Sequence, residues 1–432
     1  MSAAEGGMAV GFLGLGVVGS GVFRALTQRA DLHVKSILVR DLGKPRPVPV
    51  PPGLLTTDPD RVLNDPDISL VVEVMGGERP ALDYIRRALE AGKHVVTANK
   101  EVMAKHGLEL LKLAGEKGVN LLFEASVGGG IPVLGPLMKD LAANRILSIH
   151  AIINGTTNYI LTRMAQAGLN FADALREAQE LGYAEPDPTN DVEGIDAAYK
   201  LAILATLAFH TAVRVEGVYR EGITRLQAKD FRYAKELGYA IKLLAIARRN
   251  GDALQLRVHP VWVPQEHLLA KVDGAFNAVE IEGDLVGHVV FHGQGAGPLP
   301  TSSAVVGDML EVSRGLAAGR VRSPALRLEE GLRVLPMEEV ETRYYIRLTA
   351  ADQPGVLAQI ARIMGDLRIS IDSVIQKDAD RRAQTAEIVI TTHPAREAAV
   401  QKALGEIAKL SVVRQVSNLV RVEDWPEEGS GA

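Results

Sequence analysis

The amino-acid sequence predicts an α/β protein of three parts: a doubly wound parallel sheet, an α/β domain with a mixed open sheet, and a ferredoxin-like domain. Over the first third, short apolar runs alternate with helix-like segments, which is typical of a doubly wound parallel sheet. From Arg343 onward the pattern becomes β-α-β-β-α-β within about 80 residues, the order of a ferredoxin-like domain. Only 4% of the residues are aromatic, which favours helices packed on sheets over a β-sandwich.

Residues 1–145 are predicted to form the first domain. Its strands are expected at Met8–Leu13, Val34–Val39, Leu70–Val74, Val95–Thr97 and Val119–Phe123. Helix-like segments such as Ala81–Glu90 and Glu101–Glu116 separate these runs, so the strands should lie parallel. The proline-rich spacer Gly43–Pro52 suits neither a helix nor a central strand and should form a surface loop.

Residues 146–299 are predicted to form the second domain, and residues 342–432 the third. The second domain should contain strands at Leu147–Ile153, Leu254–Val263, Ala278–Glu282 and Leu285–His292, and helices at Phe171–Leu181, Ile195–Phe209 and Thr224–Arg248. A Ser- or Thr-capped helix at Pro300–Ala318 is expected to return to the first domain and complete it. Residues 319–341 are charged and carry two prolines, so they should form a linker.

Composition excludes several classes of protein. The net charge of −5 is spread without a basic stripe, so nucleic acid is not an expected partner. No apolar run approaches the roughly 20 residues that span a bilayer, and the N-terminus lacks a basic region before its apolar stretch. We therefore expect a cytoplasmic protein without membrane contacts. The absence of cysteine excludes thiolate catalysis, and with scattered histidines it makes a transition-metal site unexpected.

A glycine-rich turn, Gly14-x-Gly16-x-x-Gly19, directly follows the first predicted strand and opens a helix. A dinucleotide-binding turn requires this context, because the glycine backbone and the helix N-terminus offer N–H groups to a pyrophosphate. A turn that is rich in glycine for packing reasons alone is the alternative. The first domain is therefore predicted to be of the Rossmann type and to bind a dinucleotide.

Three charged residues at the end of the second predicted strand bear on the choice of dinucleotide. Asp41 would accept hydrogen bonds from a free ribose 2′-hydroxyl and favour NAD. Arg40 and Lys44 would instead pair with a 2′-phosphate and favour NADP. The sequence favours NADP(H), with NAD(H) as the alternative. A further alternative is that all three charges lie on a solvated loop and contact no cofactor.

The segment Glu185–Lys200 carries several carboxylates into an almost wholly apolar helix. Lys200 is the only charge in Ala197–Phe209, and Asp196 lies one turn before it on the same helix face. Burial of an ammonium group is costly unless it is paired, so Lys200 is predicted to be an active-site lysine whose proton can move. An ordinary structural Asp/Lys helix pair is the alternative.

Four further turns are candidates for ligand contacts. Lys100 follows a strand end, where open α/β sheets bind ligands. A surface lysine at a helix start is the alternative, but the positive end of the helix dipole disfavours it, so we expect an anionic group nearby. The glycine-rich loop 127–131 after Glu124 can hold a small cation or form an ordinary turn at a helix start, and spacing does not decide. Asn154-Gly155-Thr156 can cap a helix or hydrogen-bond a substrate. The backbone at Gly297 can close over a cofactor.

Six sequence blocks, in order over roughly residues 8–320, resemble the homoserine dehydrogenase family. They are GLGVVG, VVTANKE, EASVGGGIP, INGTTNYIL, the EPDP to DAAYK block, and GQGAGPLPTSSAVVGD. The family reversibly reduces L-aspartate 4-semialdehyde to L-homoserine with a reduced nicotinamide cofactor, in threonine, isoleucine and methionine synthesis. The C-terminal domain, with Asp352–Leu357 at its first strand-to-helix turn, resembles an ACT domain, an amino-acid-binding module associated with threonine feedback in such relatives.

The resemblance implies a role for each residue that matches a family motif. Lys200 would donate the proton, Lys100 would be a second active-site lysine, and Asp196 would support Lys200. Glu185 and Asp191 would hold the ammonium group of the substrate.

The resemblance also implies ligand contacts outside the catalytic residues. Glu124 and the carbonyls of Val127, Gly129 and Ile131 would bind sodium or potassium. The candidate cofactor-binding residues are Gly14, Gly16, Val17, Val18, Gly19, Arg40, Lys44, Gly76, Lys100 and Gly297. The family's second domain implies a homodimer, with pairing into tetramers through the C-terminal domain as a further option.

Two competing hypotheses remain. The chain can be another dehydrogenase of a β-semialdehyde or amino acid that shares only the nucleotide domain. The absence of cysteine argues against aldehyde oxidation through a thioester, because that chemistry needs a thiolate. Alternatively, the chain is a non-catalytic amino-acid sensor on a dehydrogenase scaffold, although an intact set of Lys100, Asp196 and Lys200 speaks against this.

Overall fold

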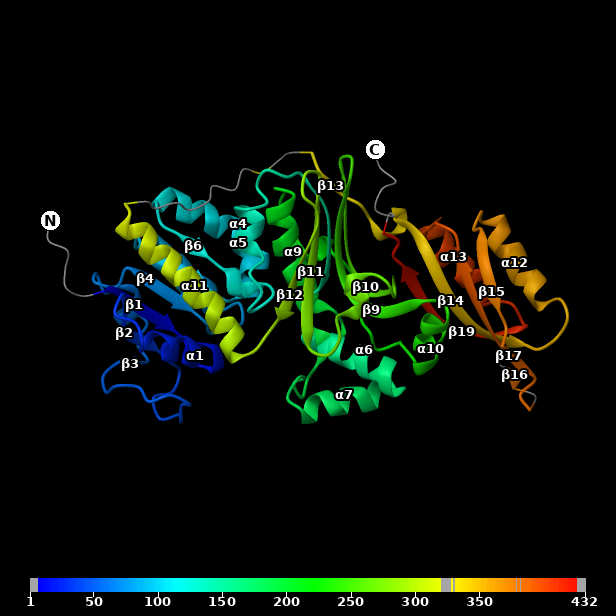
Figure 1. Ribbon diagram of the computed structural model, residues 1–432, viewed down its shortest axis with the longest axis horizontal. Helices are drawn as coiled ribbons and strands as arrows, with labels where there is room; N and C mark the ends of the chain where they lie inside the picture. Colours follow the sequence, from blue (N-terminus) through cyan, green and yellow to red (C-terminus); the bar gives the residue numbers. More distant parts are fainter. Residues whose placement is uncertain (1–6, 320–327, 329–330, 378, 381, 426–432) are drawn as a thin grey trace. The chain divides into compact units, whose positions relative to one another are not determined.

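The computed structural model describes residues 7–319, 328, 331–377, 379–380 and 382–425 (Figure 1). The chain divides into two compact units, each assembled from separate stretches of sequence. The first unit comprises Met1–Gly155, Asp196–Val218 and Phe276–Leu332. The second comprises Thr156–Ile195, Tyr219–Ala275 and Arg333–Ala432.

The first unit contains a six-stranded sheet whose paired strands are all parallel. The strand order is β3-β2-β1-β4-β5-β6, so the chain reverses direction across the sheet beside β1, as in a doubly wound fold. The strands are β1 (Met8–Leu13), β2 (Leu32–Leu38), β3 (Leu55–Thr56), β4 (Leu70–Glu73), β5 (His94–Thr97) and β6 (Leu121–Leu122). The helices between them are α1 (Val17–Leu26), α2 (Asp60–Leu63), α3 (Ala81–Glu90) and α4 (Lys100–Lys117).

Helix α11 (Pro298–Ala317) belongs to this unit although it comes much later in the sequence. It packs against α1, and Val305 and Met309 join the apolar core that also contains Val10 (Figure 1). The prediction of a Ser- or Thr-capped start at Pro300 was wrong, because the helix begins at Pro298 after Gly297. Prolines fit the first turn of a helix, where their missing N–H groups would have no partner within the helix.

Three antiparallel strands complete the first unit. They are β7 (Ile146–Ile152), β11 (Phe276–Gly283) and β12 (Gly287–Gln294), with β11 in the middle. Helix α9 (Ile195–Ala208) and the short helix α5 (Leu134–Met138) belong to the same unit. Strand β11 brings distant stretches of chain together, because β7 precedes it by more than 120 residues.

The second unit begins with α6 (Gly155–Ala167), α7 (Phe171–Glu180) and α8 (Thr189–Val192), followed by β8 (Tyr219–Arg220) and α10 (Ala228–Glu236). Strands β9 (Tyr239–Asn250) and β10 (Ala253–Pro264) form a long antiparallel hairpin. The predicted helix Thr224–Arg248 was therefore wrong, since only α10 is helical and β9 replaces its second half. Gly238, in a left-handed conformation with φ of 83°, separates the two. Pairing along β10 outweighs the helix propensity of the Ala- and Leu-rich stretch.

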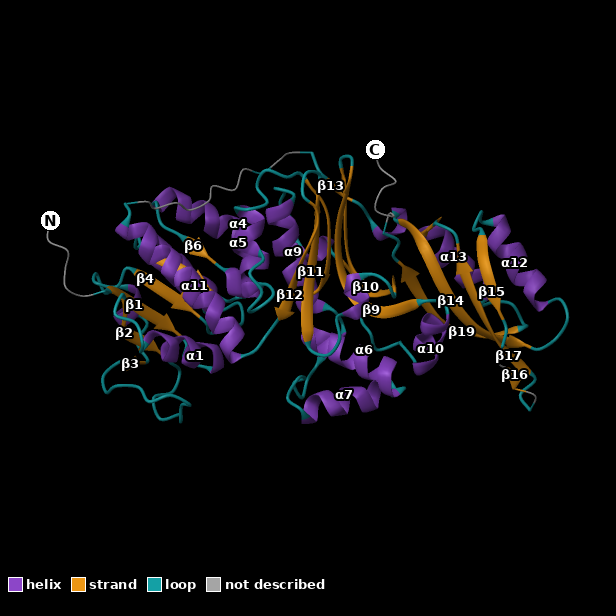
Figure 2. Ribbon diagram, in the orientation of Figure 1, coloured by secondary structure: helices purple, strands orange, loops and turns teal. Residues whose placement is uncertain are grey.

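The C-terminal part has the predicted β-α-β-β-α-β order. Its elements are β14 (Glu341–Ala351), α12 (Val356–Asp366), β15 (Ile371–Ile375), β17 (Thr385–Thr392), α13 (Glu397–Ile407) and β19 (Val413–Val422), with two-residue strands at β16 (Ala379–Asp380) and β18 (Ala395–Arg396). Strand β19 pairs with β14 and also, in parallel, with β10, so this part continues the hairpin's sheet (Figure 2). The predicted fold class is confirmed.

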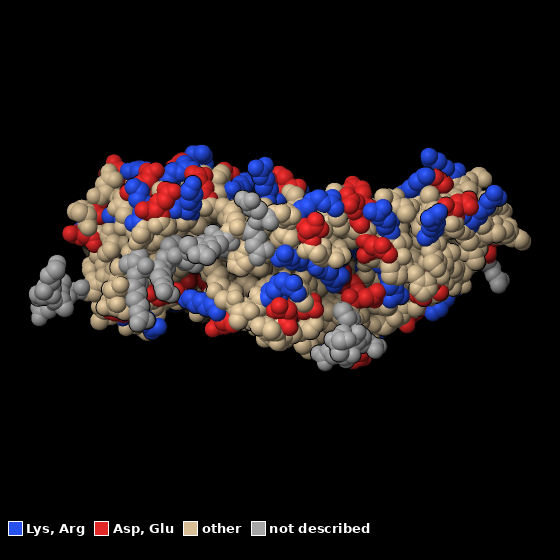
Figure 3. Space-filling view, turned by 90° about the horizontal axis from the view of Figure 1, so that it is seen from above, with Lys and Arg blue, Asp and Glu red and all other residues tan. Residues whose placement is uncertain are grey.

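The predicted linker 319–341 falls partly outside the described residues, at 320–327 and 329–330. Its described end contains β13 (Arg333–Val334), which pairs with β10. Within the described chain, no helix has the length and apolar character needed to cross a membrane. On the face shown in Figure 3, basic and acidic side chains are interspersed.

Candidate active site

Lys200 and Asp196 form a buried ion pair on α9, as their spacing predicted. The Lys200 Nζ lies 2.7 Å from Asp196 Oδ2, and the two side chains are 10% and 4% exposed. Lys200 Nζ also donates to the carbonyl of Ile153 at 2.8 Å. Helix α9 buries nearly its whole circumference, because almost every residue after Asp196 is apolar. The ammonium group is thus held by two acceptors in surroundings with little water.

Asp196 collects further donors from distant parts of the sequence. Lys100 donates to Asp196 Oδ1, although the two residues are 96 positions apart. Asn154 Nδ2 donates to Asp196 Oδ2 at 2.9 Å. The structure therefore brings Lys100, Asn154, Asp196 and Lys200 into one cluster. Two lysines around a single carboxylate make this cluster net positive, which suits a site where negative charge develops on a substrate oxygen.

The charge of Asp196 is stabilised by its surroundings. Burial alone would raise the pKa of this carboxyl, but the charges of Lys200 and Lys100 and their hydrogen bonds outweigh burial and hold the pKa well below its usual range. The two lysines therefore favour the charged form of Asp196, which accepts hydrogen bonds from both of them and orients them.

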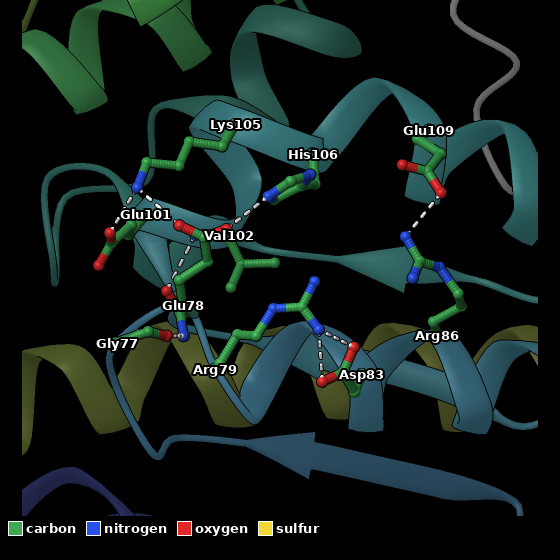
Figure 4. A network of polar contacts seen from close by, with 11 residues as sticks. Gly77, Glu78, Arg79, Asp83, Arg86, Glu101, Val102, Lys105, His106 and Glu109 are labelled. Atoms are coloured by element: carbon green, nitrogen blue, oxygen red, sulfur yellow. Dashed lines mark hydrogen bonds and ion pairs between the residues drawn. The ribbon is translucent and has the colours of Figure 1, made fainter.

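Lys100 is the first residue of α4 and is presented by a capped turn. The side chain of Asn99 caps the helix by accepting the Val102 N–H at 3.1 Å. Asn99 also donates to the carbonyl of Gly77 at 2.7 Å (Figure 4, where Gly77 and Val102 are labelled). The Lys100 side chain is 44% exposed, so it is the accessible lysine of the cluster.

The glycine-rich turn after β1 has the geometry of a pyrophosphate-binding turn. Gly14 adopts a φ of 103°, which favours glycine, and an added Cβ at Gly19 would come within 2.7 Å of the Gly14 carbonyl. An added Cβ at Gly16 would meet open space, which leaves room for a ligand. Gly16 precedes α1 and offers no capping side chain, so the first N–H groups of α1 remain available for an anion.

A cleft of about 740 Å³ lies over this turn. Among its lining residues are Gly14, Gly16, Val17, Arg40, Lys44 and Gly76. Val18 and Gly19 follow within α1. Asp41 turns one carboxylate oxygen toward its own loop, where it accepts the Gly43 N–H at 2.8 Å. The residues present therefore fit a dinucleotide, with two cations at the expected ribose position.

Glu124 caps a helix with its carboxylate. Its two oxygens accept the N–H groups of Val133, Leu134 and Gly135 at 2.6 to 2.8 Å, at the start of α5. The loop 127–131 is tightly packed, since an added Cβ at Gly129 would lie 2.3 Å from the carbonyl of Gly295. No group of three or more acidic or histidine side chains able to hold a metal occurs among the described residues. A cation at this loop would therefore depend on main-chain carbonyls such as those of Val127, Gly129 and Ile131.

The other residues that the sequence predicted to bind cofactor or substrate lie in several different elements. Gly297 precedes α11 with a φ of 120°. Gly155 begins α6, and the Thr156 hydroxyl donates to the carbonyl of Tyr183 at 2.7 Å. In the second unit, Glu185 is exposed and Asp191, on α8, is half-buried.

Glu73 is a buried carboxylate that the sequence analysis missed. It stands at the end of β4 and is 0% exposed. Its Oε2 accepts the Thr97 hydroxyl at 2.5 Å, and its Oε1 accepts the Met75 N–H at 2.8 Å. The signal in the sequence was a single acidic residue closing an apolar strand, two positions before Met75-Gly76-Gly77.

Comparisons with known proteins agree on one family. A model described as the NAD-binding domain of homoserine dehydrogenase matches residues 14–124, and a homoserine dehydrogenase model matches residues 132–310. An ACT domain model matches residues 344–412. A curated homoserine dehydrogenase from Synechocystis sp. is 45% identical over 430 residues, which cover 96% of this chain and 99% of the relative. One from Mycobacterium tuberculosis is 44% identical, covering 96% and 97%.

Solved structures give the same result. A crystal structure of a homoserine dehydrogenase from Thiobacillus denitrificans has a TM-score of 0.90 at 45% identity, covering 97% of this chain and 99% of that one. A hyperthermophilic archaeal homoserine dehydrogenase in complex with NADPH has a TM-score of 0.62 at 27% identity, covering 73% of this chain and 99% of that one.

Proposed function

The chain belongs to the homoserine dehydrogenase family, and from this we propose that it reversibly reduces L-aspartate 4-semialdehyde to L-homoserine, with Lys200 as the proton donor. It is an NAD(P)-dependent oxidoreductase that acts on a CH–OH group, with a C-terminal ACT domain. The observation that carries the proposal is the cluster in which Lys100, Asn154 and Lys200 surround the buried carboxylate of Asp196. The cofactor supplies the hydride, and the protein must supply a proton and stabilise charge.

Lys200 is suited to donate that proton. An aldehyde that receives a hydride becomes an alkoxide, which needs an acid at the moment it forms. Lys200 is desolvated, and the acceptors Asp196 and Ile153 hold its ammonium group in one orientation. The more exposed Lys100 is proposed to contact the substrate or the cofactor, and Asp196 to keep both lysines charged and oriented.

The amino-acid end of the substrate needs acidic partners. We assign its ammonium group to the exposed Glu185 and the half-buried Asp191, which come shortly before α9 in the sequence. Asn154, Gly155 and Thr156 are proposed as further polar contacts, and the backbone N–H groups at the start of α6 support this for Gly155 and Thr156.

The function is tested by following NADPH oxidation after addition of L-aspartate 4-semialdehyde. We expect turnover that depends on the semialdehyde, and the reverse reaction with L-homoserine and NADP. A non-catalytic sensor would bind an amino acid without oxidising NADPH. Turnover with other semialdehydes but none with L-aspartate 4-semialdehyde would instead favour the other dehydrogenase hypothesis.

We propose that the enzyme prefers NADP(H), with NAD(H) as the poorer cofactor. Arg40 and Lys44 line the cleft at the ribose position, while Asp41 is partly engaged in its own loop. Replacing Arg40→Ala should raise the KM for NADPH by about tenfold and leave the KM for NADH unchanged, because a 2′-phosphate loses a charge-assisted partner. Steady-state kinetics with both cofactors measure this ratio.

The exposed Arg29, which pairs with Asp31 in the same unit, provides the control. Arg29→Ala should leave the NADPH to NADH ratio at its parental value. An unchanged ratio in Arg40→Ala would contradict the assignment of Arg40.

Two further ligands are proposed. Sodium or potassium would bind the main-chain carbonyls of Val127, Gly129 and Ile131 near Glu124, and the left-handed conformations of Gly128 and Gly129 support this by turning the loop sharply. L-Threonine is the proposed ligand of the ACT domain, at the turn 352–357. We propose a homodimer as the basic assembly, with tetramers formed through the ACT domain as the next level.

A further inference from the structure

Glu73 connects the carboxyl ends of two neighbouring strands. Strands β4 and β5 are parallel, and Glu73 and Thr97 are register partners at their last positions. The Glu73 carboxylate accepts the Thr97 hydroxyl at 2.5 Å, and both side chains are 0% exposed. The carboxyl edge of a parallel sheet is where ligands bind in this kind of fold, so the contact lies at a functional edge.

One oxygen of Glu73 holds the loop after β4. Its Oε1 accepts the Met75 N–H at 2.8 Å. Gly76 and Gly77 then adopt φ values of 76° and 73°, a double left-handed turn that only glycine adopts easily. Gly76 lines the cofactor cleft. The carboxylate therefore fixes the start of a loop that faces the cofactor.

The other oxygen acts on the turn that presents Lys100. Thr97 donates its hydroxyl to Glu73 and accepts the Asn99 N–H at 3.0 Å. Asn99 caps α4, whose first residue is Lys100, and it also bonds Gly77 (Figure 4). The two turns are thus joined twice, through Glu73 with Thr97 and through Asn99.

We propose that Glu73 is a positioning residue that sets the cofactor loop 75–77 and the Lys100 turn relative to each other. The proposal rests on the functions assigned above to Gly76 and Lys100. Burial raises the pKa of Glu73, so this carboxylate is kept in an unfavourable environment. Such a group is retained where its hydrogen bonds organise other residues.

Two substitutions separate positioning from simple support of the fold. Glu73→Ala should weaken NADPH binding and lower kcat, each by about tenfold, because both turns lose their common acceptor. Glu73→Gln should restore most of both. Its amide oxygen can accept from Met75 and its NH₂ can donate to Thr97, whose hydroxyl has a spare acceptor site.

Thr97→Val gives an independent readout if Glu73→Ala does not fold. It removes the Thr97 hydroxyl that joins Glu73 to the Asn99 N–H but leaves the contact from Glu73 to Met75. We expect kcat to fall while NADPH affinity stays near the parental value.

His94→Ala is the matched control. His94 is buried at the opposite end of β5, where its Nδ1 accepts the Asn120 N–H at 3.0 Å. We expect both His94→Ala and Glu73→Ala to lower Tm, but His94→Ala should leave NADPH affinity and kcat unchanged.

NADPH affinity is measured by fluorescence titration and kcat by the semialdehyde assay. The function assigned to Lys100 is tested separately, because it would fail if a Lys100→Ala variant had normal kcat. The titration needs no turnover, so it would still test the role of Glu73 in that case. Two results would overturn the proposal. One is a Glu73→Ala protein that loses only thermal stability, like His94→Ala. The other is a Glu73→Gln protein as impaired as Glu73→Ala.

Discussion

The Lys200→Ala substitution is expected to lower kcat by about 10³-fold and to leave NADPH binding nearly intact. General-acid catalysis accelerates a reaction by about 10²- to 10⁴-fold. The variant should fold normally. Asp196 keeps Lys100 and Asn154 as donors when Lys200 is removed, so no buried charge is left unpaired. Stopped-flow or steady-state NADPH oxidation gives kcat, and fluorescence titration gives the affinity for NADPH.

Lys112 is the matched control for this substitution. It lies on α4 with a side chain that is 79% exposed and makes only a long contact of 3.9 Å with Glu116. Lys112→Ala should match the parent enzyme in both measurements. A Lys200→Ala enzyme with unchanged kcat would refute the assignment of the proton donor and require another acid.

The Arg347→Ala substitution is expected to destabilise the second unit by about 3 to 5 kcal/mol, because it removes a buried guanidinium that pairs with the buried carboxylate of Asp230. The Arg347 Nε lies 2.7 Å from Asp230 Oδ1, and the side chains are 3% and 0% exposed. Arg347 also bonds Glu387 and Gln227, at 3.1 and 2.9 Å. These contacts connect strand β14 of the ACT domain to helix α10.

Tryptophan fluorescence during denaturant unfolding measures this loss. The chain has two tryptophans, Trp262 and Trp425, and both lie in the second unit. Trp262 stacks on Tyr345 at 4.2 Å, two residues from Arg347. Arg362 is the control, since it is 84% exposed and 3.9 Å from Asp366. Arg362→Ala should change the unfolding free energy by less than about 0.5 kcal/mol. If Arg347→Ala changed the unfolding free energy as little as Arg362→Ala, the ion pairs of Arg347 would contribute little to stability.

The parts of the site that sequence reasoning found are those with a local signal. Asp196 and Lys200 stand one helical turn apart in an apolar helix, so the sequence of this one helix is enough to predict that they pair. Lys100 was found from its position after a strand. Its partner, however, lies 96 residues away, and no local pattern could have identified Asp196 as that partner.

Glu73 was missed because its hydrogen-bond partner, Thr97, lies on the neighbouring strand. A glutamate at the end of an apolar run resembles an ordinary strand terminus, and Thr97 is 24 residues later in the sequence. The prediction of a helix was wrong at Tyr239–Asn250 for a related reason. Its alanines and leucines favour a helix locally, but pairing with β10 decides its conformation.

The parallel pairing of β19 with β10 has a consequence for how this enzyme can evolve or be shortened. A chain cut before β14 would expose one edge of the hairpin, with unpaired backbone amides and carbonyls open to self-association. It would also remove Arg347, Tyr345 and Asn418, which donate hydrogen bonds to the carboxylate of Asp230. The ACT domain and the hairpin therefore lie in one compact unit, and losing the domain would demand compensating changes on β10 and α10.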